Sequence, residues 1–189
     1  MNRAFLIFQL NNIENTKRVN RLRISNLVLK NPELFKYLLE IVFEIENKLS
    51  IKAAWVLEFV CAEKLEWLVP HLNYFTENIS KVKFDSAVRP ISKICEFLAK
   101  AHTSKNDSIK KGEINSKHLK KIIEAGFNWL IGNHKVAVKV YAMELLFFFG
   151  KNEDWVYKEL QLIILQNITN ESAAYKARGK KILSWINKK

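Results

Sequence analysis

The chain has 189 residues, of which 49% are hydrophobic and only 5 are Gly and 3 are Pro. This apolar content is sufficient for one packed core and excludes a disordered chain, while so few glycines and prolines cannot supply the turns of a β-sandwich or β-barrel. The net charge of +12 at pH 7 indicates an acidic partner, either a protein or a nucleic acid.

The N-terminal stretch MNRAFLIFQLNN contains an apolar run that Gln9 interrupts. The run is too short for the hydrophobic region of a secretory signal, and no small-residue cleavage site follows it. No other stretch approaches the roughly 20 apolar residues that cross a membrane. We therefore expect a cytoplasmic protein without a membrane partner, in which Cys61 and Cys95 are buried free thiols and not metal ligands.

Residues 1–30 are predicted to contribute an N-terminal basic helix, ENTKRVNRLRISNLVLK, ahead of a helical array. They include six basic side chains and one acidic side chain, whereas residues 31–70 have a net charge of −3. The positive charge is therefore distributed unevenly, and it is concentrated at the two ends of the chain and in one central loop.

Residues 31–101 are predicted to form two antiparallel helix pairs. In the first pair, NPELFKYLLEIVF precedes IKAAWVLEFVCAEK, with Asn31 as the N-cap and Pro32 at the first helical position. In the second pair, EKLEWLVPHLNYFTENI precedes KFDSAVRPISKICEFLAK. Because Pro90 has no backbone N–H, we expect this last helix to start late or to kink there.

Residues 102–116, HTSKNDSIKKGEINS, are polar without apolar periodicity and are predicted to be an inserted loop. Residues 117–189 are predicted to form two more pairs. SKHLKKIIEAGFNWLIG precedes HKVAVKVYAMELLFFFGK, and NEDWVYKELQLIILQNI precedes SAAYKARGKKILSWINKK. In the last pair we expect Asn152 to cap its helix, with two acidic residues in the first turn, where they suit the helix dipole.

The second helices of the four pairs repeat one apolar pattern. Their equivalent positions are separated by 34, 50 and 37 residues, and removing about 13 residues of the inserted loop makes the long interval regular. Stacked repeats bury faces that no single pair could bury alone. The four equivalent positions, called the repeat markers, are Ala54, Val88, Val138 and Tyr175.

The segment LVPHLNYFTENISKVKFDSAVRPISKICEFL resembles a HEAT repeat. It carries the Leu-x-Pro-x-Leu start of a HEAT first helix at residues 68–72 and the Val-Arg pair of a HEAT second helix at residues 88–89. The resemblance to HEAT and armadillo proteins implies an all-α fold, a right-handed α-α superhelix (solenoid) of about four antiparallel helix pairs plus an N-terminal helix. The Trp-x-x-Leu-Gly-x-x-Tyr signature of tetratricopeptide repeats is absent, and a non-repeating helical bundle remains the alternative.

The sequence contains no recognisable catalytic or metal-binding motif. HExxH, CxxC, GxSxG, P-loop and GxGxxG patterns are absent, and no two histidines have the spacing of metal ligands. We therefore expect no metal, no cofactor and no catalytic residue. The four histidines, expected at the surface or in loops, are His71, His102, His118 and His134.

Four stretches, NLVLKNPELF, AAWVLEFVC, DSAVRPISKICEFL and ESAAYKARGKKIL, resemble short bacterial proteins that carry the label adenylosuccinate lyase. The resemblance implies cleavage of adenylosuccinate. Lyases of that superfamily use a Ser-Ser-x-Met-Pro-x-Lys-x-Asn loop, whereas the two methionines here are Met1 and Met143 and neither is next to a proline. No catalytic residue is therefore carried over to this sequence.

The remaining functional signal is basic and lies on the second helices, which would line the concave side of a HEAT solenoid. The positions one residue after each repeat marker, and those one turn later, include five basic residues. Two aromatic residues occupy the same positions in the first pair. We define the basic column as Arg89, Lys93, Lys139, Lys176 and Lys180, and its aromatic flank as Trp55 and Phe59.

Three interpretations of the basic column follow. It binds an acidic protein; it binds nucleic acid, as in the HEAT-like DNA glycosylases, because cations beside aromatic rings suit phosphates and bases; or it is only a solvated helix face. The other tryptophans, expected to pack in the core or between repeats, are Trp67, Trp129, Trp155 and Trp185.

Overall fold

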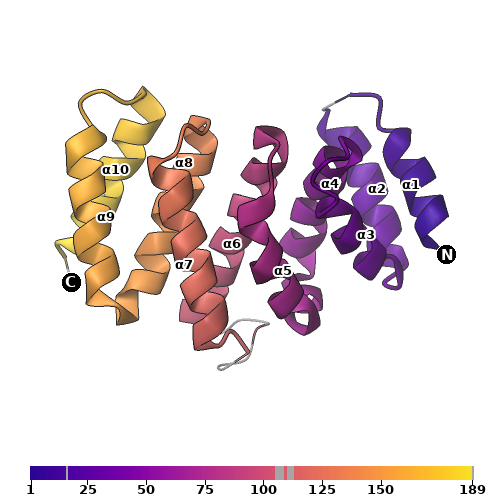
Figure 1. Ribbon diagram of the computed structural model, residues 1–189, viewed down its shortest axis with the longest axis horizontal. Coiled ribbons are helices and arrows are strands. Elements are labelled where there is room, and N and C mark those ends of the chain that lie inside the picture. The colour runs from indigo at the N-terminus through magenta and orange to yellow at the C-terminus, as the bar shows by residue number, and fades with distance from the viewer. Residues whose placement is uncertain (16, 105–108, 110–112, 189) are drawn as a thin grey trace. The chain divides into compact units, whose positions relative to one another are not determined.

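The computed structural model describes residues 1–15, 17–104, 109 and 113–188. Every regular element in these ranges is helical (Figure 1), which confirms the predicted all-α class. The α-helices are α1 Arg3–Asn11, α2 Arg18–Lys30, α3 Leu34–Val42, α4 Leu49–Glu63, α5 Leu72–Asn78, α6 Asp85–Thr103, α7 Ser116–Ile131, α8 Val136–Phe149, α9 Asp154–Asn167 and α10 Ala173–Ile186; short 3-10 helices are η1 Leu65–His71, η2 Ile79–Lys81 and η3 Gly150–Asn152.

Two compact units make up the chain: unit 1 is Met1–Ile94 and unit 2 is Cys95–Lys189. The boundary falls within α6, so the first part of this helix belongs to unit 1 and the rest to unit 2. α3 packs against α4 in unit 1, and in unit 2 α7 packs against α8 and α9 against α10. The two helices of each pair run antiparallel (Figure 1), which is the packing of a HEAT-like solenoid.

Unit 1 contains a helix that the sequence analysis did not assign. α1 packs against α3 and α4, and α2 packs against α4, so both helices pack against the first predicted pair. The side chain of Asn2 caps α1 by accepting a hydrogen bond from the backbone N–H of Phe5 at 3.0 Å. The helix buries Leu6 and Leu10. Periodicity did not identify it, because a short apolar run fits a helix and a strand equally well.

Two predicted N-caps are wrong. The Nδ2 of Asn31 donates to the carbonyl O of Leu27 at 2.8 Å, so this side chain closes α2, and α3 begins only at Leu34. Asn152 was predicted to cap the helix of the last pair, but α9 begins at Asp154 with Glu153 as its N-cap residue. In both places a turn or 3-10 segment precedes the helix, and helix starts shift easily by a few residues at such junctions.

The predicted first helix of the second pair is divided at Pro70. Residues Leu65–His71 form the 3-10 helix η1, which contains Pro70, and α5 follows at Leu72. A proline inside an α-helix removes the hydrogen bond to the residue four positions earlier and its ring collides with that carbonyl. The different hydrogen-bond pattern of the 3-10 helix accommodates the proline before the α-helix begins.

The predicted late start of the next helix is wrong. α6 begins at Asp85 and includes Pro90. Pro90 cannot donate to the carbonyl O of Ser86, and this oxygen instead accepts a hydrogen bond of 3.0 Å from Nε1 of Trp55 on α4. Because the orphaned carbonyl has a partner on the neighbouring helix, α6 tolerates an internal proline.

Glycines allow two close helix approaches in unit 2. A Cβ atom at Gly126 of α7 would lie 2.7 Å from Cδ1 of Leu145 on α8. A Cβ atom at Gly179 of α10 would lie 2.9 Å from Cγ2 of Ile164 on α9. α8 packs against α7, α9 and α10, so it is the central helix of this unit.

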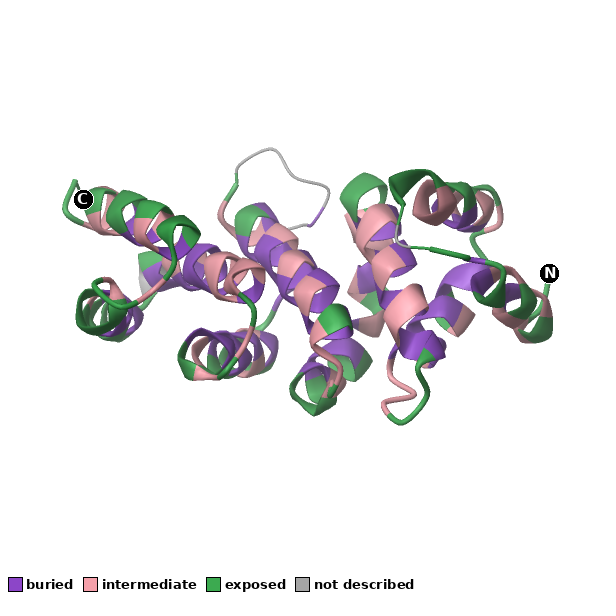
Figure 2. Cartoon of the chain, turned by 90° about the horizontal axis from the view of Figure 1, so that it is seen from above, coloured by how far each residue is buried: buried purple, intermediate pink, exposed green. Residues whose placement is uncertain are grey.

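The buried side chains lie on the helix faces that meet neighbouring helices (Figure 2). Cys61 and Cys95 are 1% and 0% exposed and are free thiols, which confirms that prediction. The repeat markers are also core residues, as their apolar periodicity predicted. Each of Ala54, Val88, Val138 and Tyr175 is at most 1% exposed.

The remaining tryptophans pack against other aromatic rings or in the core, as predicted. Trp155 of α9 lies against Phe127 of α7, with ring centroids 5.8 Å apart, although 55% of Trp155 is exposed. The others are Trp67 against Phe35, Trp185 against Phe147, and the buried Trp129.

The predicted inserted loop, residues 102–116, is described only in part. α6 extends to Thr103 and α7 begins at Ser116, while residues 105–108 and 110–112 lie outside the described ranges. Ile109 and Ile114 are 6% and 2% exposed. The insertion therefore buries two of its apolar side chains.

Candidate functional site

Three residues at intervals of 34 positions occupy equivalent places in unit 1. They are Arg21 on α2, Trp55 on α4 and Arg89 on α6. α2 packs against α4, and the hydrogen bond from Trp55 to Ser86 joins α4 to the first part of α6. These three positions therefore lie on alternate α-helices of unit 1. Trp55 was the first predicted residue of this face, and the same interval continued upstream leads to Arg21 on α2.

Two arginines of α2 lie over the aromatic flank on α4. Cζ of Arg21 is 5.9 Å from the ring centroid of Trp55 and 5.3 Å from that of Phe59. Cζ of Arg18 is 5.5 Å from the centroid of Phe59. All three distances are within the range of cation–π attraction. The aromatic flank therefore supports cations that belong to the protein itself.

Arg89 is held by a carboxylate on the neighbouring helix. Its Nη2 donates to Oε2 of Glu58 at 2.6 Å, and its Nη1 donates to Oε1 at 3.4 Å. The side chains of Arg89 and Glu58 are 30% and 16% exposed. Two parallel hydrogen bonds between a guanidinium and a carboxylate fix both groups in orientation.

The charged state of Arg21 is disfavoured by its surroundings. Burial lowers the pKa of Arg21, the like charges of Arg89 and Arg18 lower it further, and Glu58 raises it. The Nε of Arg21 is buried, and no described atom accepts its hydrogen. The three guanidinium groups and the one carboxylate together have a net charge of +2. We call Arg18, Arg21, Arg89 and Glu58 the arginine cluster.

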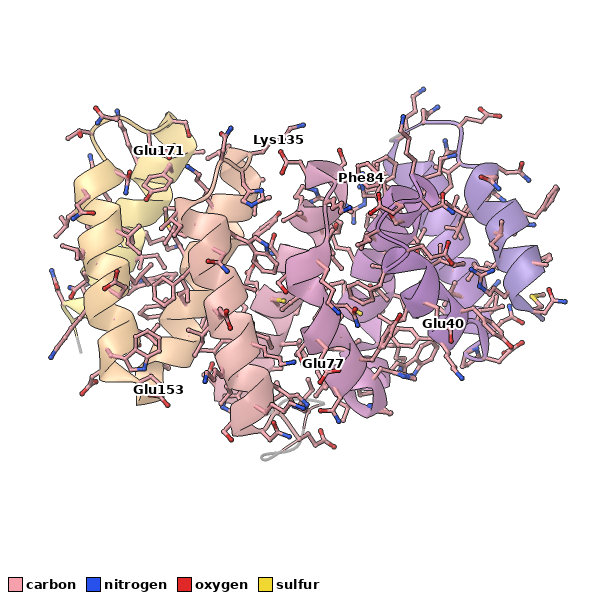
Figure 3. The ribbon with its side chains drawn as sticks, in the orientation of Figure 1. Glu40, Glu77, Phe84, Lys135, Glu153 and Glu171 are labelled. Atoms are coloured by element: carbon pink, nitrogen blue, oxygen red, sulfur yellow. The ribbon has the colours of Figure 1, made fainter. Side chains whose placement is uncertain are left out.

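In unit 2, Lys139 of α8 contacts the start of α10. Its Nζ lies 2.5 Å from Oε1 of Glu171 and 6.0 Å from the ring centroid of Tyr175. The Lys139 side chain is only 15% exposed. In Figure 3, Glu171 and Lys135 lie at one end of unit 2, and Glu153 lies at the opposite end. The ion pair therefore connects the beginning of α8 to the segment before α10.

Lys176 and Lys180 lie one turn apart on α10. Lys180 is exposed and Lys176 is partly exposed, and neither forms an ion pair within the described part of the chain. In unit 1, Lys93 lies one turn after Arg89 on α6 and is partly exposed. The structure thus places Arg89 with Lys93 in unit 1, and Lys139 with Lys176 and Lys180 in unit 2.

Two buried carboxylates of unit 2 were missed by the sequence analysis. Glu144 on α8 is 5% exposed, and it pairs with Nζ of Lys100 on α6 at 3.0 Å and with Arg178 on α10. Glu96, which is 0% exposed, also pairs with Lys100. A glutamate within an apolar helix pattern, as in YAMELL and ICEFL, is the signal that could have identified them. These ion pairs connect α6, α8 and α10, and they give Lys100 and Arg178 carboxylate partners within the protein.

One histidine prediction is wrong. His118 is 4% exposed and lies in the first turn of α7, not at the surface or in a loop. Its backbone N–H donates to Oδ1 of Asn115 at 3.1 Å, and its Nδ1 accepts from the backbone N–H of Asn115 at 3.4 Å. This reciprocal pair is a capping box. Burial lowers the pKa of His118 and outweighs a backbone hydrogen bond with Glu113 that raises it.

Arg18, Arg21 and Glu58 were not among the predicted site residues. The repeat was measured from Ala54 onward, so Arg21 was missed, and with it Arg18, which precedes Arg21 on α2. Continuing the 34-residue interval upstream from Trp55 leads directly to Arg21. Glu58 could not be found in this way, because its role depends on the side chain of Arg89, which comes from another helix.

Within the described ranges, no group of three or more His, Cys, Asp or Glu side chains could hold a metal ion. In the same part of the chain, no helix is both long enough and apolar enough to cross a membrane.

Comparison with known proteins identifies the repeat. A family model described as a HEAT repeat domain matches residues 9–110, which is more than half of the chain. The matched region includes the end of α1, from Gln9, and all of α2 to α6. No curated protein and no solved structure matches the chain. The helical pairs and the family match together show that the chain belongs to the HEAT repeat domain family.

Proposed function

We propose that the chain is a non-catalytic binding protein that engages an acidic macromolecular partner through the basic column. The observation that carries the proposal concerns α10, where Lys176 and Lys180 have no ion-pair partner among the described residues. The carboxylates of Glu144 and Glu171 pair with other cations. Cations that no internal carboxylate neutralises attract an anionic partner from solution.

The other column residues support the same role in a different way. Arg89 and Lys139 are held by Glu58 and Glu171, so their side chains are already ordered before a partner arrives. Ordering a long side chain on binding costs about 0.5–1.5 kcal/mol. A repeat scaffold that fixes its cations in advance avoids part of that cost. The two free buried thiols support a reducing compartment, so we propose the cytoplasm as the location.

Nucleic acid is the second candidate partner. The observation that favours it is the placement of cations on successive second helices, combined with the net charge of +12. A partner that makes several phosphate contacts would show a linear fall of log affinity with log salt concentration. An acidic protein segment would depend on salt less steeply, because its charges are fewer and no condensed counterions are released.

The proposal is tested by fluorescence anisotropy with three labelled probes: a polyglutamate peptide, a single-stranded DNA and a duplex DNA, each over a salt series. We compare the wild type with the double variant Lys176→Gln/Lys180→Gln. Neither lysine has an ion pair among the described residues, so the double substitution changes the charge without removing a salt bridge that the structure describes. We expect the wild type to bind at least one probe at physiological salt and the variant to bind it more weakly.

The matched control is Lys120→Gln/Lys158→Gln, which removes the same charge from exposed positions on the first helices α7 and α9. An equal loss in both double variants would mean that only the net charge matters, and the column would not be a site. Absence of binding to all three probes would exclude the proposed function. A steep salt slope with DNA and no binding of polyglutamate would make nucleic acid the partner.

A further inference from the structure

We propose that the arginine cluster of unit 1 binds a phosphate monoester on a protein partner, namely a phosphorylated serine or threonine side chain. The inference rests on the proposed function, because it names the group that unit 1 recognises in the acidic partner. It adds Arg18 and Arg21 to the predicted binding residues and gives Glu58 a role.

The charge of the cluster matches that of a phosphate monoester. Arg18, Arg21 and Arg89 carry three positive charges and Glu58 carries one negative charge, so the net charge is +2. A phosphorylated side chain carries about −1.5 to −2 at pH 7 and presents three strong acceptor oxygens. A phosphodiester in a nucleic-acid backbone carries only one negative charge and would leave the cluster partly uncompensated.

The aromatic rings of the cluster also favour a phosphorylated side chain over a nucleotide chain. Single-stranded nucleic acid gains much of its affinity by stacking bases on open aromatic faces. Here the guanidinium carbons of Arg18 and Arg21 lie over the ring of Phe59, and Arg21 also lies over Trp55. A ring face covered by an arginine is not open to a base. The rings therefore position cations, and guanidinium forks suit phosphate oxygens.

Arg21 is the residue that gains most from such a ligand. Burial and two neighbouring cations lower its pKa, and its Nε–H donor is buried without an acceptor among the described atoms. A dianion close to the cluster would stabilise the charged form of Arg21 and offset the repulsion from Arg18 and Arg89. An anion gains more from a partly desolvated cation than from a fully hydrated one.

Glu58 acts as an internal competitor for the same guanidinium. Both carboxylate oxygens accept hydrogen bonds from Arg89, so an incoming phosphate meets a cluster that is already partly neutralised. This contact holds Arg89 in place in the absence of a ligand. Removing the charge of Glu58 should therefore strengthen phosphate binding. A variant that failed to fold could not bind more tightly, so this result would not be explained by a loss of folding.

The first experiment is a calorimetric titration with a short alanine-rich peptide that carries one central phosphoserine. The same peptide with serine, and with glutamate, serves as the ligand control. Arg21→Gln should weaken binding of the phosphopeptide about 10-fold or more, because a hydrogen bond to a charged group contributes roughly 1.5–3 kcal/mol. The matched variant is Arg23→Gln on the same helix. Arg23 is exposed, and it donates to Oε1 of Gln9 at 3.2 Å and is not part of the arginine cluster. The affinity of Arg23→Gln for the phosphopeptide should therefore stay within about twofold of the wild type.

The second experiment uses Glu58→Gln, which can keep an acceptor for Arg89 while raising the net charge of the cluster to +3. Its affinity for the phosphopeptide should rise several-fold. The matched control is Glu66→Gln, since Glu66 pairs with the exposed Lys64 at 3.6 Å and with no other cation in the described part of the chain. Unchanged or weaker binding by Glu58→Gln would exclude the competitor role and the site with it.

The outcomes separate this inference from the proposed function. Equal binding of the glutamate and phosphoserine peptides would keep the acidic partner but overturn phosphate recognition. Binding of single-stranded DNA, with no preference for the phosphopeptide over its serine form, would assign the cluster to nucleic acid and overturn the inference. Loss of phosphopeptide binding in Arg21→Gln but not in Lys176→Gln/Lys180→Gln would support it. Failure of every anionic probe would overturn both proposals.

Discussion

The indole of Trp55 replaces the backbone donor that Pro90 lacks. Its Nε1 donates a hydrogen bond of 3.0 Å to the carbonyl O of Ser86, four residues before Pro90 on α6. The two residues are therefore coupled although they are not in the same helix. One consequence is local: the internal proline costs α6 less than it would cost an isolated helix. Another concerns the site, because the same bond fixes the ring over which Arg21 lies.

We expect the stability effects of Trp55→Phe and Pro90→Ala to be non-additive. Trp55→Phe alone should lower the free energy of unfolding by about 1 kcal/mol through the lost hydrogen bond, in addition to a small packing term. In the Pro90→Ala background the alanine N–H can donate to Ser86, so the same substitution should cost less. Urea unfolding of the four proteins gives the coupling energy, which we expect to be about 0.5–1 kcal/mol. Strict additivity would show that the indole contact does not compensate for the proline.

The core of the second helices could be predicted from the sequence because it depends on local periodicity. Val88 and Val138 are buried since apolar residues at helical spacing place one face against the neighbouring helices. Pro90 was judged by the same local rule, and there the rule failed. The partner that rescues its helix, Trp55, belongs to another helix, and no pattern within α6 reveals it.

In the candidate site, too, positions could be predicted from local spacing, whereas contacts between helices could not. Regular spacing predicted Arg89 and Trp55 on one face, and the same spacing leads to Arg21 once α2 is included. The state of each charge could not be predicted, because it depends on which carboxylate lies opposite. Arg89 and Glu58 are 31 positions apart. Whether a basic residue is neutralised is decided by tertiary packing and not by the sequence nearby.

A second prediction concerns the buried carboxylate Glu144. It accepts from Lys100 and Arg178, and thereby connects α8 to α6 and α10. Glu144→Gln keeps the shape of the side chain but removes its charge. Because Lys100 and Arg178 are 44% and 30% exposed, water replaces part of the lost interaction, and we expect a loss of about 1–2 kcal/mol in the free energy of unfolding.

The measurement is urea unfolding followed by circular dichroism. Glu159→Gln on α9 is the matched control, since Glu159 is exposed and forms no ion pair within the described residues. Equal stability of the two variants would mean that the Glu144 contacts contribute nothing beyond ordinary surface charge.

A third prediction concerns pH. Burial lowers the pKa of His118, and burial also lowers the pKa of His71 and of His102. In each case the unfolded chain, with a pKa of about 6.5, binds a proton more readily than the folded chain. The contribution of these histidines to the free energy of unfolding should therefore be constant above about pH 7 and fall as the pH decreases through about 6.5.

His118→Gln tests the share of this one histidine. Glutamine at the third helical position can still accept from the N-cap backbone N–H, as in a capping box, but it does not titrate. The fall in unfolding free energy between about pH 7 and about pH 5 should be smaller in the variant, and the remainder comes from the other two histidines. An identical pH profile in the two proteins would show that His118 protonates equally in the folded and unfolded chain.

The last prediction concerns the close contact between Gly150 and Tyr157. A Cβ atom at Gly150 would lie 2.5 Å from Cδ1 and 2.6 Å from Cε1 of the tyrosine ring. That ring is 6% exposed and stacks on Phe147, with centroids 5.7 Å apart and an interplanar angle of 17°, so it has little room to move. Gly150→Ala should lower the free energy of unfolding by about 1–3 kcal/mol through overpacking.

Gly126→Ala is the comparison, because its nearest neighbours are side-chain carbons of leucines, which can rotate. In addition, alanine favours the helix by about 1 kcal/mol over glycine. Thermal unfolding should therefore show a clearly lower midpoint for Gly150→Ala than for Gly126→Ala, and the reverse order would mean that the tyrosine ring yields more easily than the leucines.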